Sequence, residues 1–156
     1  MTISITRLLV ALRVLGCVAL AGCSSEPADT HPQQLVSKRQ AIFKQFAKTF
    51  EPMGLVARER KDYNPREFNV IAVELDKLAS QPWQYFTADG NYPPSKTKPE
   101  AWTKPQEFKV AQDNFQASVK KLLVVAQNGE AEAIKSSVDV VQKNCKACHD
   151  DFRVTR

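Results

Sequence analysis

The sequence predicts an all-α fold, and more specifically an antiparallel four-helix bundle. Apolar residues recur at intervals of three or four along most of the chain, the spacing that places side chains on one face of a helix. Only three glycines follow Gly22 in the 156 residues: Gly54, Gly90 and Gly129. Four such segments can be distinguished. None can bury its apolar face alone, so all four are expected to share one core.

The first two helices are expected on either side of residue 60. The first carries a stripe made of Leu35, Arg39, Ile42, Phe43, Phe46 and Phe50. Pro52 should kink or interrupt this helix, because proline lacks the amide that continues the hydrogen-bond ladder. Asn64, Pro65 and Glu67 are typical of a helix start. The second helix then presents Phe68, Ile71, Leu75 and Leu78.

Residues 81–99 hold four prolines and predict a long ordered loop. The third helix is expected to follow, with Thr103 as its N-cap and Asn128-Gly129 as its stop. Its stripe consists of Phe108, Ala111, Phe115, Val119, Leu122 and Ala126. The fourth helix carries Ile134, Val138, Val141, Cys145, Cys148 and Phe152, spaced by three or four.

The N-terminal residues 1–22 are expected to be a lipoprotein signal peptide. Arg7 and Arg13 precede a short apolar run, and Leu20-Ala21-Gly22-Cys23 resembles a bacterial lipobox in which Cys23 becomes lipidated. The alternatives are an uncleaved membrane anchor or a plain secretory signal cut nearby. The apolar run is shorter than the roughly 20 residues that a membrane span needs.

Three regions follow from this interpretation: the signal peptide 1–22, a flexible tether 23–33 and a folded domain 34–156. The mature protein would be periplasmic and attached to the membrane only through its lipid anchor. Ser24 after Cys23 favours the outer membrane. Loss of Arg7 and Arg13 leaves 20 basic and 17 acidic residues, a net charge of +3. This mild charge does not indicate a nucleic-acid partner.

The Cys145-Lys-Ala-Cys148-His149 motif is the strongest chemical signal in the sequence. In an exported protein Cys-x-x-Cys-His is the attachment signal for haem c, with two thioethers and one axial imidazole. The three residues fall within an arc of about 100° on a helix. A disulfide between the two cysteines is an alternative. Structural zinc is disfavoured because the fourth ligand would have to be the distant His31, and a thioredoxin-like pair should follow a strand. The prediction is therefore one covalent haem c near the C-terminal end of the fourth helix.

With the haem motif in this position, residues 36–156 resemble the class II cytochromes c, specifically the cytochrome c' family. The resemblance rests on four segments: Arg39-Gln40, Gln81-Pro-Trp-Gln-Tyr-Phe86, Lys98-Pro-Glu-Ala-Trp102 and Cys145-Lys-Ala-Cys-His-Asp-Asp-Phe-Arg153. It implies that Cys145 and Cys148 attach the haem and that His149 is the proximal iron ligand. It also implies homodimers.

The resemblance further implies roles for the surrounding residues. Arg39, Gln40 and Glu100 would lie near the haem edge and its propionates, and Arg153 would lie beside the proximal face. For Arg39 and Glu100 the alternative is a surface charge or a helix-end ion pair, and for Arg153 it is a solvated C-terminal charge. Phe43 stands where the family places the residue that faces the iron opposite the proximal histidine.

The sequence supplies few candidates for a sixth iron ligand. Besides His149, the mature chain offers Met53, next to Pro52, and His31, in the expected tether. A lysine would first have to lose its charge. The expectation is therefore a five-coordinate, high-spin iron with Phe43 as an apolar lid. This site would bind nitric oxide and carbon monoxide, for nitric oxide buffering or tolerance and single-electron exchange with an unidentified periplasmic partner.

Two other functional classes were compared with this expectation. A six-coordinate, low-spin electron carrier would need His31 or a lysine on the iron. A peroxidase-type enzyme needs a distal acid–base group, and Phe43 supplies none, so the protein is not expected to be an enzyme.

Overall fold

The computed structural model describes residues 27–128 and 131–154. Its α-helices are α2 (Leu35–Ala57), α3 (Pro65–Ala79), the short α4 (Glu100–Thr103), α5 (Pro105–Asn128) and α6 (Ala131–Phe152). Two 3₁₀ helices, η2 (Trp83–Tyr85) and η3 (Ala88–Gly90), lie between α3 and α4. Within the described ranges no β-strand occurs, and the one bridge is antiparallel, between Thr97 and Arg153. None of the helices found there is long and apolar enough to cross a bilayer.

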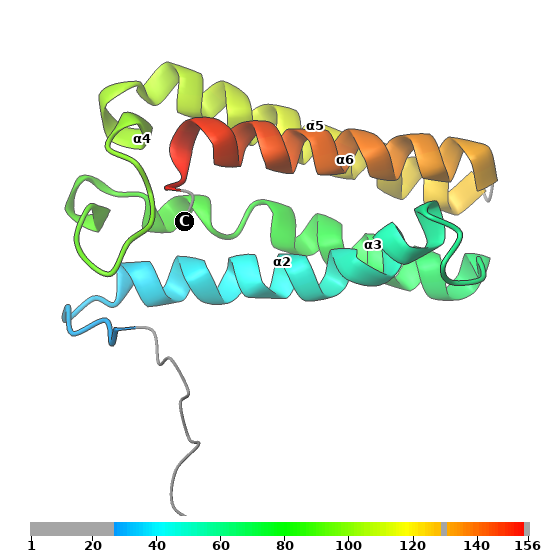
Figure 1. The fold of residues 1–156 in the computed structure, drawn as a ribbon, viewed down its shortest axis with the longest axis horizontal. Coiled ribbons are helices and arrows are strands. Elements are labelled where there is room, and N and C mark those ends of the chain that lie inside the picture. The colour runs from blue at the N-terminus through cyan, green and yellow to red at the C-terminus, as the bar shows by residue number, and fades with distance from the viewer. Residues whose placement is uncertain (1–26, 129–130, 155–156) are drawn as a thin grey trace, which may run out of the picture.

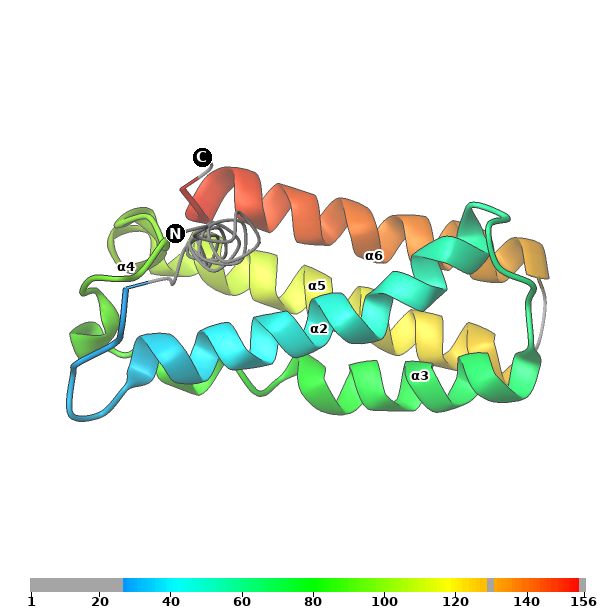
Figure 2. The ribbon, with the colours of Figure 1, turned by 60° about the horizontal axis from the view of Figure 1, so that its bottom comes forward.

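The four long helices run alternately in opposite directions (Figures 1 and 2). Helix α5 packs on both α6 and α3, and α2 packs on α3 and α6. The connection from α3 to α5 forms the end of the bundle at which α2 begins and α6 finishes (Figure 1). The prediction of an all-α antiparallel four-helix bundle is confirmed. The C-terminal end of α6 thus lies beside the N-terminal half of α2.

The core is filled by the stripes that the sequence indicates. Its fully buried side chains include Phe68, Leu75, Val119, Leu122, Ile134, Val138 and Val141. A second, smaller cluster of Ala101, Phe108 and Phe152 lies at the end of the bundle where α6 finishes. Trp83 packs against both clusters. The four stripes therefore meet in one continuous interior.

Helix α2 differs from the prediction at Pro52. Of the two expected effects, a kink or an interruption, the interruption is wrong, because the helix continues through Pro52 to Ala57. The next residue, Met53, is fully buried in the main core, and Gly54 is also buried. Burial of an apolar side chain contributes about 1.5–3 kcal/mol, which offsets much of the hydrogen bond lost at the proline.

The predicted start of α3 is confirmed. Asn64 adopts an extended conformation, and its Oδ1 accepts the amides of Arg66 and Glu67, each at 3.1 Å. The prediction that Thr103 caps the third long helix is wrong. Thr103 is the last residue of α4, and α5 begins at Pro105. Proline at a first helical position is favoured because its missing amide needs no partner there.

The loop 81–99 is ordered by two indole donors. Trp83 Nε1 donates to the Ala79 carbonyl and Trp102 Nε1 to the Thr87 carbonyl, both at 2.8 Å. At the C-terminus, the Lys98 amide donates to the Phe152 carbonyl and the Val154 amide to the Lys96 carbonyl, both at 2.8 Å. The loop is thereby tied to the end of α6.

The last residues of the predicted tether 23–33 contact the folded domain. The Asp29 carboxylate accepts the Ser37 amide at 2.8 Å, and the His31 ring stacks on Tyr92 at 4.3 Å. Ordered contacts with the domain thus begin at residue 29. The signal peptide and the predicted lipidation at Cys23 lie outside the described residues.

Core packing on α6 can be tested with two valines of the same helix. Val138 is fully buried, whereas Val140 is 40% exposed. Val138→Ala should lower the free energy of unfolding by about 2 kcal/mol, from lost burial and the cavity that remains. Val140→Ala should change it by less than about 0.5 kcal/mol. Chemical unfolding followed by circular dichroism measures both, and equal effects would contradict this account of the core.

Candidate functional site

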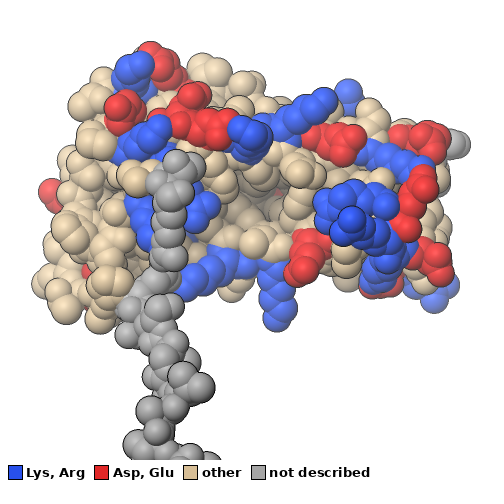
Figure 3. Space-filling model, in the orientation of Figure 1, with Lys and Arg blue, Asp and Glu red and all other residues tan. Residues whose placement is uncertain are grey.

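A cavity of about 560 Å³ lies between α2 and α6, closed by side chains from α5 and the loop 81–99. In the orientation of Figure 1, the surface is hollowed between these two helices, with Lys and Arg side chains at its edges (Figure 3). Cofactor sites usually occupy about 300–1,000 Å³ and are mostly apolar with a few placed polar groups. The cavity matches this description.

The α6 wall carries the Cys-x-x-Cys-His motif. Cys145, Cys148 and His149 all line the cavity, as the helical spacing predicts. Cys145 packs against the main core and Cys148 against the smaller cluster around Phe108 and Phe152. Both thiols are free, and burial raises the pKa of each to about 11. They are therefore uncharged sulfur atoms at an apolar wall.

His149 lines the same cavity while remaining exposed to solvent along the cleft. Partial burial lowers the pKa of His149, the Arg153 charge lowers it further, and Asp150 opposes the shift. The imidazole is accordingly neutral at pH 7, the form that binds metals. Within the described residues no group of three or more His, Cys, Asp or Glu could hold a metal ion.

The α2 wall is aromatic where it faces this motif. Phe43 lines the cavity and makes edge contacts with Phe46, Trp83 and Phe86, at ring-centroid distances of 5.5, 5.9 and 6.3 Å. Such contacts fix the orientation of a ring. Phe43 thus presents a fixed apolar surface across the cavity from α6.

Arg39 is the most unusual charged residue of the site. It is 2% exposed and lines the cavity one helical turn before Phe43. Its guanidinium donates to the Tyr85 carbonyl at 3.0 Å and to Ser95 Oγ at 2.7 Å, and lies 4.7 Å from the Phe86 ring centre. Arg39 is therefore not a surface charge.

The remaining predicted site residues divide into two groups. Gln40 and Arg153 line the cavity, and the Arg153 amide continues the helix by donating to the His149 carbonyl at 3.0 Å. Glu100 stands in the first turn of α4 and does not line the cavity. The structure brings together every predicted haem-site residue except Glu100. Glu100 instead fits a role at the start of a helix, where acidic side chains are favoured.

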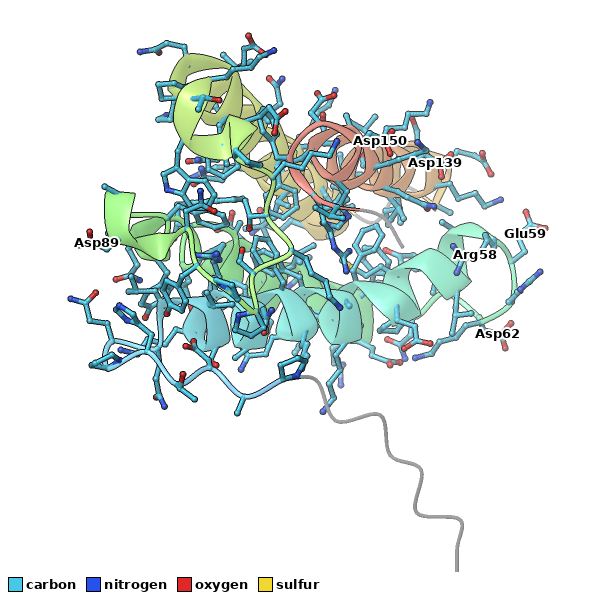
Figure 4. The ribbon with its side chains drawn as sticks, turned by 60° about the vertical axis from the view of Figure 1, so that its left-hand side comes forward. Arg58, Glu59, Asp62, Asp89, Asp139 and Asp150 are labelled. Atoms are coloured by element: carbon cyan, nitrogen blue, oxygen red, sulfur yellow. The ribbon has the colours of Figure 1, made fainter. Side chains whose placement is uncertain are left out.

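Charge around the cavity is strongly one-sided. Its lining contains Arg39, Lys44, Arg58, Lys96 and Arg153, and its sole carboxylate is that of Glu51. Other acidic side chains lie elsewhere: Asp139 and Asp150 project from the outer side of α6, and Glu59 and Asp62 lie past the end of α2 (Figure 4). The cavity therefore favours a ligand with negatively charged groups.

Three residues of this lining, Arg58, Ser95 and Lys96, were not predicted from the sequence. Arg58 lies at the far end of the α2 wall. Its guanidinium lies close to Gly54, since a Cβ added to that glycine would be 3.0 Å from Arg58 Nη1. The helical spacing from Phe43 through Phe46 and Phe50 to Gly54 extends toward it and could have indicated this position. Ser95 and Lys96 come from the loop, and no periodic pattern marks them.

Taken together, the residues fit a covalently attached haem. Two thiols and a neutral imidazole share one wall, an aromatic surface faces them, and basic groups surround the opening. Between residues 27 and 154 as described, no carboxylate forms an ion pair with the buried Arg39. The Tyr85 carbonyl and Ser95 hydroxyl give Arg39 polar partners but do not neutralise its charge. A buried charge is most stable with an opposite charge nearby, and haem propionates would supply one.

Comparison with known proteins agrees with this site. The profile of the Cytochrome C' family matches residues 34–153. A cytochrome c' from Alcaligenes xylosoxydans xylosoxydans is 29% identical over 125 residues, covering 78% of this chain and 94% of the relative. A cytochrome c' from Halomonas halodenitrificans is 28% identical over 128 residues, covering 78% of this chain and 97% of the relative.

Solved structures give the same result. The nitric oxide complex of a variant cytochrome c prime from Alcaligenes xylosoxidans superposes with a TM-score of 0.77 at 26% identity, covering 83% of this chain and 100% of that one. A carbon monoxide-bound variant of the same protein gives 0.76 at 26% identity, covering 82% and 100%. The profile match, the bundle and the cavity show that this chain belongs to the cytochrome c' family and that its cofactor is covalently bound haem c.

Proposed function

We propose that this protein binds nitric oxide and carbon monoxide at a five-coordinate, high-spin haem iron. His149 would be the one protein ligand, Cys145 and Cys148 would hold the haem, and Phe43 would cover the opposite face. The observation that carries the proposal is the composition of the cavity lining, which contains Phe43, no methionine and no histidine besides His149.

The two conventional candidates for a sixth ligand lie elsewhere. Met53 is fully buried in the main core, and neither it nor His31 lines the cavity. His31 stacks on Tyr92, and its Nδ1 accepts the Gln33 amide at 3.3 Å. For either residue to reach the iron, packing that the folded domain already contains would have to be broken.

A lysine ligand is the route to the alternative, a six-coordinate electron carrier. Lys44 and Lys96 line the cavity. A lysine with an ordinary pKa is protonated at pH 7, and only its neutral amine has the free electron pair that a metal needs. Desolvation of a lysine is costly, which disfavours this alternative.

The apolar distal wall supports selection among gases. Haem supplies an iron position that binds diatomic molecules, and the polarity of the distal pocket decides which ligands are favoured. Phe43 offers no hydrogen-bond donor, so bound dioxygen, which gains polarity, receives no stabilisation from it. Nitric oxide needs no such donor. The Phe43 ring also occupies space over the iron position, which should slow the binding of either gas.

The relatives support the same reading. The structures that superpose on this chain include variants of cytochrome c prime from Alcaligenes xylosoxidans, one with nitric oxide bound and one with carbon monoxide bound. We extend this to a role in nitric oxide buffering or tolerance, with single-electron exchange as a second activity. The protein would act as a binding protein and electron carrier, not as an enzyme.

Location and assembly form part of the same proposal. The Leu20–Cys23 segment supports lipidation at Cys23 and attachment to a periplasmic membrane face, with the outer membrane favoured by Ser24. Family resemblance supports a homodimer. Mass spectrometry of the membrane-extracted protein tests the lipid, and sedimentation tests the dimer.

Gas titration of the reduced protein tests the central claim. Carbon monoxide and nitric oxide should each produce a new absorption spectrum with a saturable dependence on concentration. Before gas is added, the reduced protein should show one broad band in the green, as expected for high-spin iron. Sharp split bands, or failure to bind either gas, would favour the six-coordinate alternative.

Phe43→Ala should raise the carbon monoxide association rate about tenfold, the change produced when a barrier falls by about 1.4 kcal/mol. Phe43→Leu should give an intermediate rate. Phe50→Ala, two turns farther along the same cavity wall, serves as the matched control and should leave the rate near that of the parent. Stopped-flow absorption measures all four proteins, and an unchanged Phe43→Ala rate would show that Phe43 does not cover the iron.

The two cysteines can be assigned by haem extraction. Cys145→Ala and Cys148→Ala should each retain haem through the remaining thioether. The double variant should release its haem into acidified organic solvent, because no covalent bond remains. Haem retained by the double variant would contradict the assignment of both residues.

A further inference from the structure

The N-terminus of α2 is capped by Asp29, from the segment just before the helix, and by Tyr92, which is remote from it in sequence. Its own N-cap residue, Gln34, has φ 50° and ψ 38° and makes no side-chain capping hydrogen bond. The amides of the first helical turn need acceptors. The Val36 amide donates to the Tyr92 hydroxyl at 3.2 Å, and the Ser37 amide donates to Asp29 Oδ2 at 2.8 Å.

These two acceptors and His31 form one cluster, here named the Asp29–Tyr92 clamp. Tyr92 donates its hydroxyl to Asp29 Oδ2 at 3.4 Å, and Asp29 Oδ1 accepts the His31 amide at 3.1 Å. The His31 ring covers the Tyr92 ring at 4.3 Å with an interplanar angle of 22°. A carboxylate at this position also interacts favourably with the helix dipole.

The state of Asp29 agrees with the geometry. Burial raises the pKa of Asp29, but the hydrogen bonds from Ser37 and His31 outweigh it and hold that pKa below its ordinary value. The carboxylate is therefore ionised at pH 7. A charged acceptor makes a stronger hydrogen bond to an amide than a neutral one does.

The clamp and Arg39 join the same two parts of the protein. Tyr92 belongs to the loop 81–99 and holds the first turn of α2. One turn later, Arg39 extends from α2 to the Tyr85 carbonyl and Ser95 Oγ of that loop. Burial lowers the pKa of Arg39, whereas Tyr92 and Asp29 act in the opposite direction. The clamp therefore holds the helical turn that precedes Arg39, and the Asp29 carboxylate favours the charged guanidinium.

We infer that Asp29 and Tyr92 are positioning residues for the haem site, which hold Arg39 against the cavity and so raise the haem reduction potential. A guanidinium held close to the haem disfavours the additional positive charge of the ferric state. If the clamp is lost, the first turn of α2 loosens and Arg39 is no longer fixed at the cavity wall. This inference requires haem c in the cavity and is independent of the gas-binding proposal.

The sign of the potential change separates positioning from a direct electrostatic effect. Loss of the Asp29 carboxylate alone would raise the potential, because a negative charge stabilises ferric haem. Loss of Arg39 positioning lowers it. Asp29→Ala is therefore expected to lower the potential measured by spectroelectrochemistry. Tyr92→Phe, which retains the ring for His31 and changes no charge, should also lower it.

A double-mutant cycle assigns the effect to Arg39. In an Arg39→Gln background, Asp29→Ala and Tyr92→Phe should no longer lower the potential. Asp62→Ala removes an exposed carboxylate at the far end of α2 and is the matched charge control (Figure 4). This variant should not lower the haem reduction potential. Amide hydrogen exchange at Val36 and Ser37 should accelerate in both clamp variants and not in Asp62→Ala.

Several outcomes would overturn the inference. One is a potential that rises or stays constant in both clamp variants. Another is a decrease of equal size with and without Arg39, which would mean that the clamp acts by a route other than this guanidinium. If Asp29→Ala does not fold, Tyr92→Phe decides the question, because it deletes one hydroxyl and retains the ring.

Discussion

A buried guanidinium with no carboxylate partner among the described residues governs the architecture of this site. Transfer of a charged group out of water costs several kcal/mol unless hydrogen bonds and opposite charge compensate. Arg39 receives that compensation from a loop carbonyl, a serine hydroxyl and the face of Phe86. All of these partners belong to the segment between α3 and α4. Arg39 consequently fixes that segment against α2, and its charge leaves the cavity with a need for an anionic occupant.

The aromatic side chains of the site have a complementary role. Ring contacts lead from Phe43 to Trp83 and Phe86, and from Phe86 through Phe108 to Phe152 on α6. Each aromatic pair contributes about 0.5–1.5 kcal/mol beyond the area that it buries. The chain of rings connects the two walls behind the cavity. It makes that part of the lining apolar, whereas the basic side chains lie at the edges of the cavity.

Most of the fold and site could be predicted because local rules agreed with the final packing. The stripe through Cys145 and Cys148 continues a core stripe, so the same spacing that indicates a helix also places the haem motif on its inner face. Asn64 caps α3 for a purely local reason. The residues that were missed depend on distant partners. The burial of Met53 in the core carries α2 through Pro52. The start of α5 at Pro105 is different, because it is a local signal that the assignment of Thr103 as N-cap overlooked.

The same distinction explains the errors at the edges of the site. Asp29 lies in a segment whose composition is typical of a flexible tether, and only its partners on α2 and Tyr92 order it. Ser95 and Lys96 reach the cavity because the loop is tied to the end of α6. Glu100 was placed by resemblance alone, and the short α4 carries it away from the cavity lining. Periodicity identifies faces of helices and carries no information about how a loop returns to them.

The two walls of the cavity come from opposite ends of the folded domain, with Phe43 on the first long helix and Cys145 on the last. No contiguous fragment of the chain can therefore contain a complete cavity. Bringing two helices so far apart in sequence together costs conformational entropy before their contacts can form. Haem bonded to Cys145 and Cys148 would give the first helix an apolar surface to pack against. The prosthetic group would then act as a template for the final docking step, and premature termination before the last turns of α6 would leave α2 packed on α3 without the wall that carries the haem.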